Sequence, residues 1–390
     1  MLSSSRDVVM ANLPRIRTLS PYAAYACRHR GVCCTSGWDI PVEAAVHGRL
    51  RDAMARGVLA SKAQASFVIL PPDSPAVAMV SPIDGTCPFY DAPDHRCSVH
   101  RALGETALPT SCRHFPRICR LDDEHVDVSF SHVCPTAGEA LLDARTPFDA
   151  TVSPASCPPT LPYEGLDARG DWPPLLRPGV LMTHACHSNV EMALTRVLST
   201  TTASPESALA GIAASVEGLR RWTPDAGPLD RWIAVWAREL PTRVAETATC
   251  FTREESHEHD LACFGLVEAS IPAAWRSHLP QLECLRAAST RMTGPSSACG
   301  DAARRYLAVR AFGGWSAYQG HGVRSVVAWL DVCLALFRLG WAETGARRPD
   351  ATERELGLGA LAFADLALVH LAVPEVLNRA LARAERDTDD

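Results

Sequence analysis

The sequence predicts a mainly α protein, in which an irregular, cysteine-rich, metal-binding N-terminal region packs on an all-α C-terminal domain. Two features of the 390-residue chain support this fold class. Eight of the fifteen cysteines lie between Cys27 and Cys134, among proline, histidine and turn residues. From about Leu181 onward, apolar residues instead recur at three- and four-residue spacing, the period of an α-helix. We therefore expect three regions: a cysteine-rich metal-binding region over 1–145, a proline-rich connector over 146–180 and a helical domain over 181–390.

The cysteine-rich region contains two segments with a regular pattern. Residues 41–57 predict a short helix, because they begin with Pro41 and end with Gly57. Residues 124–133 alternate polar and apolar side chains, which predicts a strand. The remainder has only short apolar runs and is expected to be irregular. A bound metal could fix such a region in place of a large core.

The connector is marked by its prolines. Eight of them lie from Pro147 to Pro178, a density that excludes a regular helix. The pattern is typical of an extended linker or of a segment that wraps around another part of the protein.

The C-terminal region carries six segments with helical periodicity. Ser204 is a predicted N-cap of the second, with Pro205 at the first helical position and Glu206 in the first turn. No internal repeat and no βαβ alternation is visible. The segments are 189–199, 204–222, 228–244, 302–315, 323–341 and 375–386.

Charge and hydropathy exclude two classes of partner. A net charge of −6 offers no basic surface for nucleic acid. The most hydrophobic stretch, 356–374, contains Asp365 and His370, so a buried core helix is a better interpretation than a membrane span. The opening residues carry charges throughout and lack the apolar run of an export signal, so we expect a cytoplasmic protein.

Seven cysteines are the candidate metal ligands. In a reducing compartment, clustered thiols serve as metal ligands more often than as disulfides, and thiolate suits zinc, cuprous copper and iron–sulfur clusters. The chain lacks a C-x2-C pair, ferredoxin spacing and a C-x3-C-x2-C motif, so spacing alone leaves the metal open. The alternative is a set of thiols without a metal. The candidates are Cys27, Cys33, Cys34, Cys87, Cys97, Cys112 and Cys134.

The order of these motifs resembles a known family. CRHRGVCC resembles the C-x2-C-G-x-C-C opening of the cysteine-cluster family of zinc- or iron-chelating proteins, with Arg30 where that family often has a second cysteine. CPF-x7-C and TSCRHFPR are similar to the second half of the family pattern. The resemblance covers roughly residues 25–142 and is greatest to the flagellin lysine-N-methylase branch. The elements that carry this last likeness are Gly37-Trp38, Leu103-Gly104-Glu105 and the S-x-x-C-P motif that ends at Pro135.

The resemblance implies a methyltransferase that uses S-adenosylmethionine and holds an iron–sulfur cluster, most simply 4Fe-4S. A cubane cluster bound by three thiolates leaves one iron open to bind a cofactor. The implied acceptor is a protein lysine such as that of flagellin, and a small-molecule amine is the alternative substrate. A third possibility is a non-enzymatic interaction protein that zinc stabilises. His29 is a possible substitute ligand, and seven candidate ligands exceed the four of one site.

A methyltransferase of this kind needs a base, because a lysine amine is protonated at neutral pH. The candidates near the motif are His114, His100, Asp91 and Glu105. No G-x-G-x-x-G loop follows a predicted strand, so the common α/β methyltransferase fold is absent.

Three further groups of polar residues have alternative interpretations. His184, His187 and Glu191 share one helix face beside Cys186, which predicts either a polar helix face or a second metal site. REESHEHD, with His257 and His259, predicts a solvated surface segment. The basic residues around Tyr306 predict a solvated basic face or a carboxylate-binding group; they are Arg304, Arg305 and Arg310.

Overall fold

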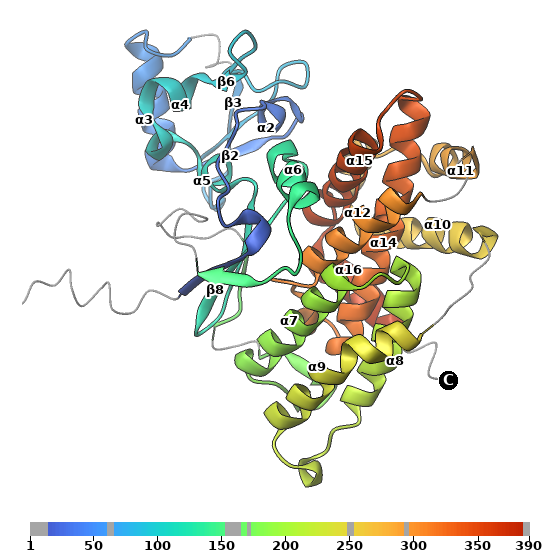
Figure 1. Cartoon of the computed structure of the whole chain (residues 1–390). Coiled ribbons are helices and arrows are strands. Elements are labelled where there is room, and N and C mark those ends of the chain that lie inside the picture. The colour runs from blue at the N-terminus through green and yellow to red at the C-terminus, as the bar shows by residue number, and fades with distance from the viewer. Residues whose placement is uncertain are drawn as a thin grey trace, which may run out of the picture.

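A computed structural model describes residues 15–60, 66–152, 165–169, 173–247, 253–291 and 296–384. Figure 1 shows a small N-terminal module, coloured blue to teal, beside a larger helical body, coloured green to red. Helices dominate the described residues, so the predicted mainly α fold is confirmed. From α7 (His184–Thr200) onward, every described element is a helix.

A five-stranded sheet joins the N-terminal half to the helical body. Its strand order is β10-β7-β8-β1-β9. β7 and β8 form an antiparallel hairpin, and β1 lies parallel to β8. The strand predicted within 124–133 is present as β8, whereas β1 and β7 lie in sequence that we expected to be irregular. The strands are β1 (Arg15–Leu19), β7 (Arg117–Leu121), β8 (His125–Phe130), β9 (Ala150–Val152) and β10 (Gly165–Asp167).

Two described parts of the segment predicted as a connector belong to this sheet. β9 pairs with β1, and β10 pairs with β7. Farther along, β11 (Leu175–Arg177) and β12 (Val180–Leu181) form a two-stranded ribbon. These parts therefore hydrogen-bond to the folded protein instead of forming a free linker. Residues 153–164 and 170–172, with several of the prolines, lie outside the described residues.

The N-terminal module has a core of its own, in contrast to the expected dependence on metal alone. Val42, Leu50 and Val99 are among its buried side chains. The predicted helix in 41–57 is present, but it begins at Ala44 because Pro41 lies in the edge strand of a three-stranded sheet, where proline is tolerated. The module's elements are α2 (Val32–Thr35), β2 (Ile40–Val42), α3 (Ala44–Ala55), β3 (Phe67–Ile69), β4 (Ala78–Val80), β5 (Tyr90–Asp91), β6 (Arg96–Cys97), α4 (Ser98–Leu103) and α5 (Thr110–His114).

The helices of the body begin where the sequence supplies caps. The Ser204 side chain accepts a hydrogen bond from the backbone of Ser207, as predicted for the N-cap of α8. Thr352 and Glu355 form a capping box at the start of α15. The remaining helices are α6 (Pro135–Asp143), α8 (Pro205–Arg220), α9 (Leu229–Glu246), α10 (Arg253–Ala269), α11 (Leu282–Arg291), α12 (Ser297–Arg310), α13 (Ser316–Gln319), α14 (Val323–Arg347), α15 (Glu353–Asp365) and α16 (Pro374–Ala384).

The buried side chains form two separate clusters. The smaller lies wholly within the module, and the larger runs from Leu19 in β1 through the sheet to Leu381 in α16. The sheet and the helices therefore share one hydrophobic core. The module is the part that packs independently.

The apolar stretch 356–374 is a bent, buried element, as the sequence predicted. α15 continues into a π-helix, η7 (Leu366–Leu371), and the chain then bends by 100° into α16. Among the described helices, α14 alone has the length and composition of a membrane span without such a bend, and 72% of its apolar window is buried inside the protein. Burial of this kind is expected of a core helix.

Candidate metal centre and adjoining cavity

Four of the seven candidate cysteines converge in the module. Cys33 and Cys34 lie in α2, which begins after Gly31 in a left-handed conformation (φ 75°). The backbone N–H of Cys87 donates to the Cys34 carbonyl at 2.7 Å and so ties two loops together. The Cys33 and Cys34 sulfur atoms are 3.9 Å apart, and the Cys34 thiol also hydrogen-bonds Cys87. Cys97, the residue before α4, is close enough to Cys33 and Cys87 for their charges to interact.

The module's backbone supplies hydrogen-bond donors to these sulfur atoms. Such bonds favour the thiolate form, and they also tune the properties of a bound cluster. The bonds run from the Phe89 N–H to Cys87, from the Val99 and His100 N–H groups to Cys97, and from the His29 N–H to Cys27 at 3.4 Å.

The hydrogen bonds among the thiols separate their pKa values. A hydrogen bond with Cys34 lowers the pKa of the Cys33 thiol. A hydrogen bond between Cys34 and Cys87 lowers the pKa of Cys87 to about 7, and because Cys34 has one S–H proton it donates to one of these two sulfur atoms at a time. The pKa of Cys34 is itself raised, since it sits between two neighbouring sulfur atoms and is partly buried. Cys33 and Cys87 are therefore the thiols of this group that ionise first, and thiolate is the form that binds metal.

The other three candidate cysteines border this group. Cys27 is exposed, and its charge interacts with those of Cys33 and of the buried Cys134. The Tyr25 hydroxyl lies 3.3 Å from the Cys134 sulfur. Cys112 is exposed on α5 and shares a cavity wall with Cys33. Electrostatic or hydrogen-bond interactions thus link six of the seven predicted ligands, and Cys112 is related to them through the cavity wall that it shares with Cys33.

Arg30, at the position where the family that the cysteine motifs resemble often has cysteine, forms an ion pair instead. Its guanidinium lies 3.1 Å from the Glu139 carboxylate of α6, and Arg28 lies 3.0 Å from the same group. These ion pairs hold the first cysteine loop against α6. His29, the possible substitute ligand, has its Nδ1 4.0 Å from the Cys27 sulfur.

The donor chemistry of this region fits an iron–sulfur cluster. Soft thiolates with N–H donors around them are the environment that such clusters require. In a tetrahedral zinc site with Zn–S bonds of 2.3 Å, sulfur ligands are about 3.8 Å apart. The Cys33 and Cys34 sulfur atoms, 3.9 Å apart, already match this spacing. No three of the described thiols lie within 4.8 Å of one another, however, so a zinc ion with three of them as ligands would require them to move closer.

A cavity of about 820 Å³ adjoins the thiols. Its wall includes Cys33 and Cys112 from the module and, on the opposite side, residues of the sheet and the helical body. Besides the two cysteines, five charged or titratable side chains line it: Asp39, Arg117, His278, Arg310 and His370. Its aromatic lining consists of Trp38, Phe115, Trp275, Trp315 and Trp329.

His370 lines the cavity, and contacts with two neighbouring side chains fix its ring. It lies in the π-helix η7, a kind of irregularity that is frequent at functional sites. Its ring stacks on Trp38 with centroids 4.8 Å apart, and its Nε2 lies 2.6 Å from the Ser131 hydroxyl. Burial lowers the pKa of His370 to about 4, so the imidazole is neutral at physiological pH.

A buried polar network lies behind this wall. Asp365 accepts hydrogen bonds from the Tyr306 hydroxyl at 2.7 Å and from the Arg310 guanidinium at 2.9 Å. Its Oδ2 also lies 2.7 Å from Nδ1 of His132, whose Nε2 lies 2.6 Å from the Tyr22 hydroxyl. Although burial opposes ionisation of Asp365, the charge of Arg310 and the contacts with His132 together lower its pKa. The predicted solvated basic face is therefore wrong for Arg310, because its charge is buried and paired.

In the sequence, His370 and Asp365 are recognisable only as polar residues that interrupt an apolar stretch, and no motif assigns either of them to a site. That interruption was the available signal, because a buried polar group needs partners and is therefore either structural or functional.

The four predicted bases do not border the cavity. His114 is fully buried in α5, and burial lowers its pKa to about 4. Asp91 pairs with Arg101 at 2.8 Å. His100 faces His29, with ring centroids 5.6 Å apart, and Glu105 is exposed. None of the four is among the described residues that line the cavity.

The predicted polar face of α7 is buried. His187 and Glu191 are each 2% exposed, and Cys186 is buried beside them. Arg120 donates to both carboxylate oxygens of Glu191, at 2.5 and 2.7 Å. Since Arg120 occupies these oxygens, the group is a buried ion-pair network and not the second metal site that we considered.

Comparison with known proteins adds no assignment: no protein-family model, no curated protein and no solved structure matches this chain. The resemblance described above therefore remains a prediction that rests on the cysteine motifs.

Proposed function

We propose that this protein is a cytoplasmic iron–sulfur enzyme that uses S-adenosylmethionine to methylate an amine. The observation that carries the proposal is the cavity of about 820 Å³, because its wall joins two candidate metal ligands, Cys33 and Cys112, to an aromatic lining from the rest of the chain. A cluster held by the thiols would thus border a space large enough for a cofactor and a small acceptor group.

The candidate ligands would hold the cluster, which supplies, when bound, an open iron site for the cofactor. The chain's own contribution is to stabilise negative charge on the sulfur atoms. The N–H groups of Phe89, Val99 and His100 do this through hydrogen bonds to Cys87 and Cys97.

The aromatic lining would bind the reactants through their positive charge. Both a sulfonium cofactor and an alkylammonium acceptor are cations, and aromatic faces attract cations of this kind. Trp38 and Trp315 line the cavity, and the Asp39 carboxylate lies in the same wall. Because Arg117 and Arg310 also line the cavity, it is the aromatic faces, and not the net charge of the wall, that support a cationic cofactor and an amine acceptor.

The acceptor must be a neutral amine before it is methylated. The apolar wall disfavours the ammonium form, because desolvation lowers the pKa of a lysine. His370 is neutral and lines the cavity, so it can accept a hydrogen bond from the amine, but with a pKa of about 4 it is too weak a base to hold the proton of the ammonium form. The proton is therefore released to solvent, and in this proposal His370 positions the acceptor in place of the bases that the sequence suggested.

The decisive experiment is the metal content and visible spectrum of protein purified without oxygen. We expect a brown protein with about four irons and broad absorption near 400 nm. The double variant Cys33→Ser/Cys34→Ser should lose iron and S-adenosylmethionine turnover together. Cys284→Ser, which removes an exposed thiol in α11 outside the group, should retain both. A colourless protein that contains only zinc, or a fully active metal-free double variant, would refute the proposal.

The size of the cavity favours a second candidate within the same chemistry, a small-molecule amine as acceptor. About 820 Å³ lies within the range of roughly 300–1,000 Å³ that is typical of small-molecule sites. Methyl transfer to flagellin would support a protein lysine as substrate. Transfer to free alkylamines and not to any protein would support the small-molecule alternative.

A further inference from the structure

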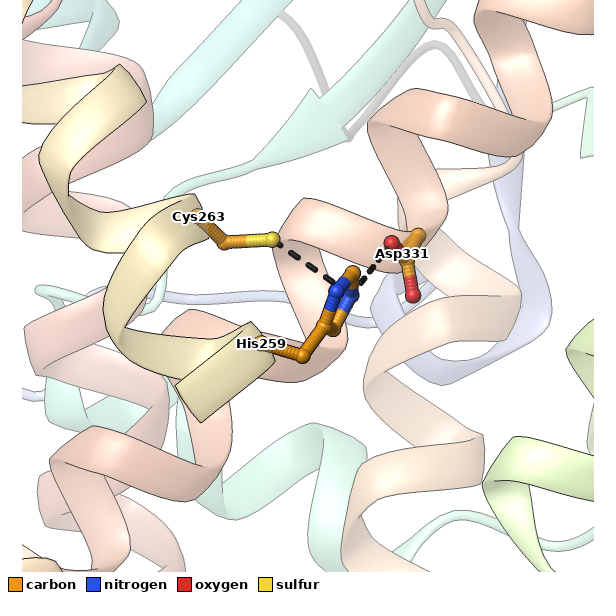
Figure 2. Close-up of side chains that lie close together, drawn as sticks. All are labelled: His259, Cys263 and Asp331. Atoms are coloured by element: carbon orange, nitrogen blue, oxygen red, sulfur yellow. Dashed lines mark hydrogen bonds and ion pairs between the residues drawn. The ribbon is translucent and has the colours of Figure 1, made fainter. Parts of the chain in front are cut away.

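A group of metal-ligating side chains lies in the helical body, away from the cysteine-rich module. His259 and Cys263 are one turn apart on α10, and Asp331 lies on the neighbouring α14. Figure 2 shows the His259 and Cys263 side chains projecting from the same helix toward Asp331. Among the described residues, this is the one group of three whose possible ligand atoms all lie within 4.8 Å of one another.

The distances in this group are close to those of a tetrahedral zinc site. With Zn–S of 2.3 Å and Zn–N and Zn–O near 2.1 Å, ligand atoms are about 3.4–3.6 Å apart. The Cys263 sulfur is already 3.6 Å from Nε2 of His259. Nε2 and the Asp331 carboxylate are 2.7 Å apart and hydrogen-bonded, so they would separate by about 0.7 Å to admit the ion. The exposed Asp331 side chain has room for this rotation.

Neighbouring residues hold the three candidate ligands in place and leave them accessible to an ion from solvent. Asp260, next to His259, pairs with Arg338 of α14 at 2.6 and 2.9 Å, which fixes the two helices relative to each other. Cys263 is buried, whereas the His259 and Asp331 side chains are 49% and 40% exposed. The group is therefore closed on the thiol side and open to solvent on the other. His257, the other histidine of the segment predicted to be solvated, lies 2.7 Å from the Ser289 hydroxyl.

We propose that His259, Cys263 and Asp331 form a zinc site with three protein ligands and water in the fourth position. Sulfur, imidazole and carboxylate together suit zinc, whereas magnesium and calcium prefer oxygen ligands alone. The site joins α10 to α14, so the bound ion stabilises the packing of these two helices. This inference does not depend on the function proposed for the module.

The test uses cobalt(II) as a spectroscopic substitute for zinc, with the full-length protein kept free of oxygen. Because the module's thiols also bind metal, the wild-type protein is compared with Cys263→Ser and Asp331→Asn. We expect each variant to bind one equivalent less cobalt, and Cys263→Ser to lose part of the thiolate-to-cobalt absorption. Cys284→Ser is the control for an unrelated thiol and should match the wild-type protein.

Thermal unfolding gives a second readout that is independent of colour. Added zinc chloride should raise the melting temperature of the wild-type protein and of Cys284→Ser more than that of Asp331→Asn, which removes no thiol and only a half-exposed carboxylate. Equal cobalt stoichiometry in the wild-type protein, Cys263→Ser and Asp331→Asn would overturn the proposal. So would equal zinc stabilisation of the wild-type protein and Asp331→Asn.

Discussion

The carboxylate of Asp365 lies 2.7 Å from Nδ1 of His132, although the two residues are 233 positions apart in the sequence. Both side chains are fully buried. Asp365 ends α15, and His132 follows strand β8, so this contact joins the helical body to the sheet. The same carboxylate balances the charge of Arg310, which lines the cavity. The wall of the cavity therefore depends on one buried carboxylate.

The substitution Asp365→Asn should destabilise the protein strongly. It leaves the buried Arg310 guanidinium without its counter-charge, which typically costs about 3–5 kcal/mol. Denaturant unfolding at pH 7.5 measures this loss. The matched control is Asp143→Asn, which breaks an exposed ion pair with Arg354 and should cost less than about 1 kcal/mol. Equal stability of the two variants would show that the network contributes little.

Arg120→Ala should destabilise the protein about as much as Asp365→Asn at neutral pH, and less at acidic pH. Arg120 is 1% exposed and pairs with both Asp127 and Glu191, so its removal leaves the buried Glu191 without its guanidinium partner and Asp127 with Arg17 alone. In the variant the pKa of Glu191 rises further above that of the unfolded chain, so protonation as the pH falls stabilises the variant. We expect a loss of about 3–5 kcal/mol at pH 7.5 and a smaller loss at pH 5. A loss that is the same at both pH values would contradict this account.

His370 should make stability depend on pH in mildly acidic solution. Its folded-state pKa of about 4 lies below the ordinary value of 6.5, so the unfolded chain binds more protons between these values. The stability that the buried, neutral His370 contributes is fully present above pH 6.5 and is lost as the pH falls toward 4. Relative to wild type, His370→Gln should therefore gain roughly 2–3 kcal/mol between pH 7.5 and 4.5. Ser131→Ala, which keeps the imidazole, should retain the wild-type pH dependence, and a parallel profile for His370→Gln would argue against the assignment.

Gly31→Ala should weaken metal binding without removing a ligand. Gly31 has φ of 75°, and an added Cβ would lie 2.6–2.9 Å from the Tyr90 ring, so the loop that carries Cys33 and Cys34 would have to move. We expect a lower metal-to-protein ratio after anaerobic purification. Gly218→Ala is the control, because it lies in α8 with no atom within 4 Å of the added methyl group and should leave the metal content unchanged. Unchanged metal content in both variants would show that the loop geometry is not required.

Local patterns in the sequence were sufficient for the class of fold. The three- and four-residue periodicity after Leu181 corresponds to helices, and Ser204 caps α8 as its position predicted. These features depend on residues near one another in the chain, so the sequence contains the information directly. The concentration of cysteines likewise marked the region in which pairwise interactions link six of the seven candidate thiols, and that they bind a metal stays a prediction.

The tertiary structure decided which polar residues share a site. His370 reaches Trp38, and Asp331 reaches His259, only because segments far apart in the chain pack against each other. The same holds for strands β9 and β10: their proline-rich surroundings predicted an extended linker or a wrapping segment, but not that these strands pair with β1 and β7. By itself, the sequence determined the helices and the cysteine motifs, because both are local patterns. The cavity, the buried charge network and the His259–Cys263–Asp331 group are products of long-range packing, which a single sequence does not record.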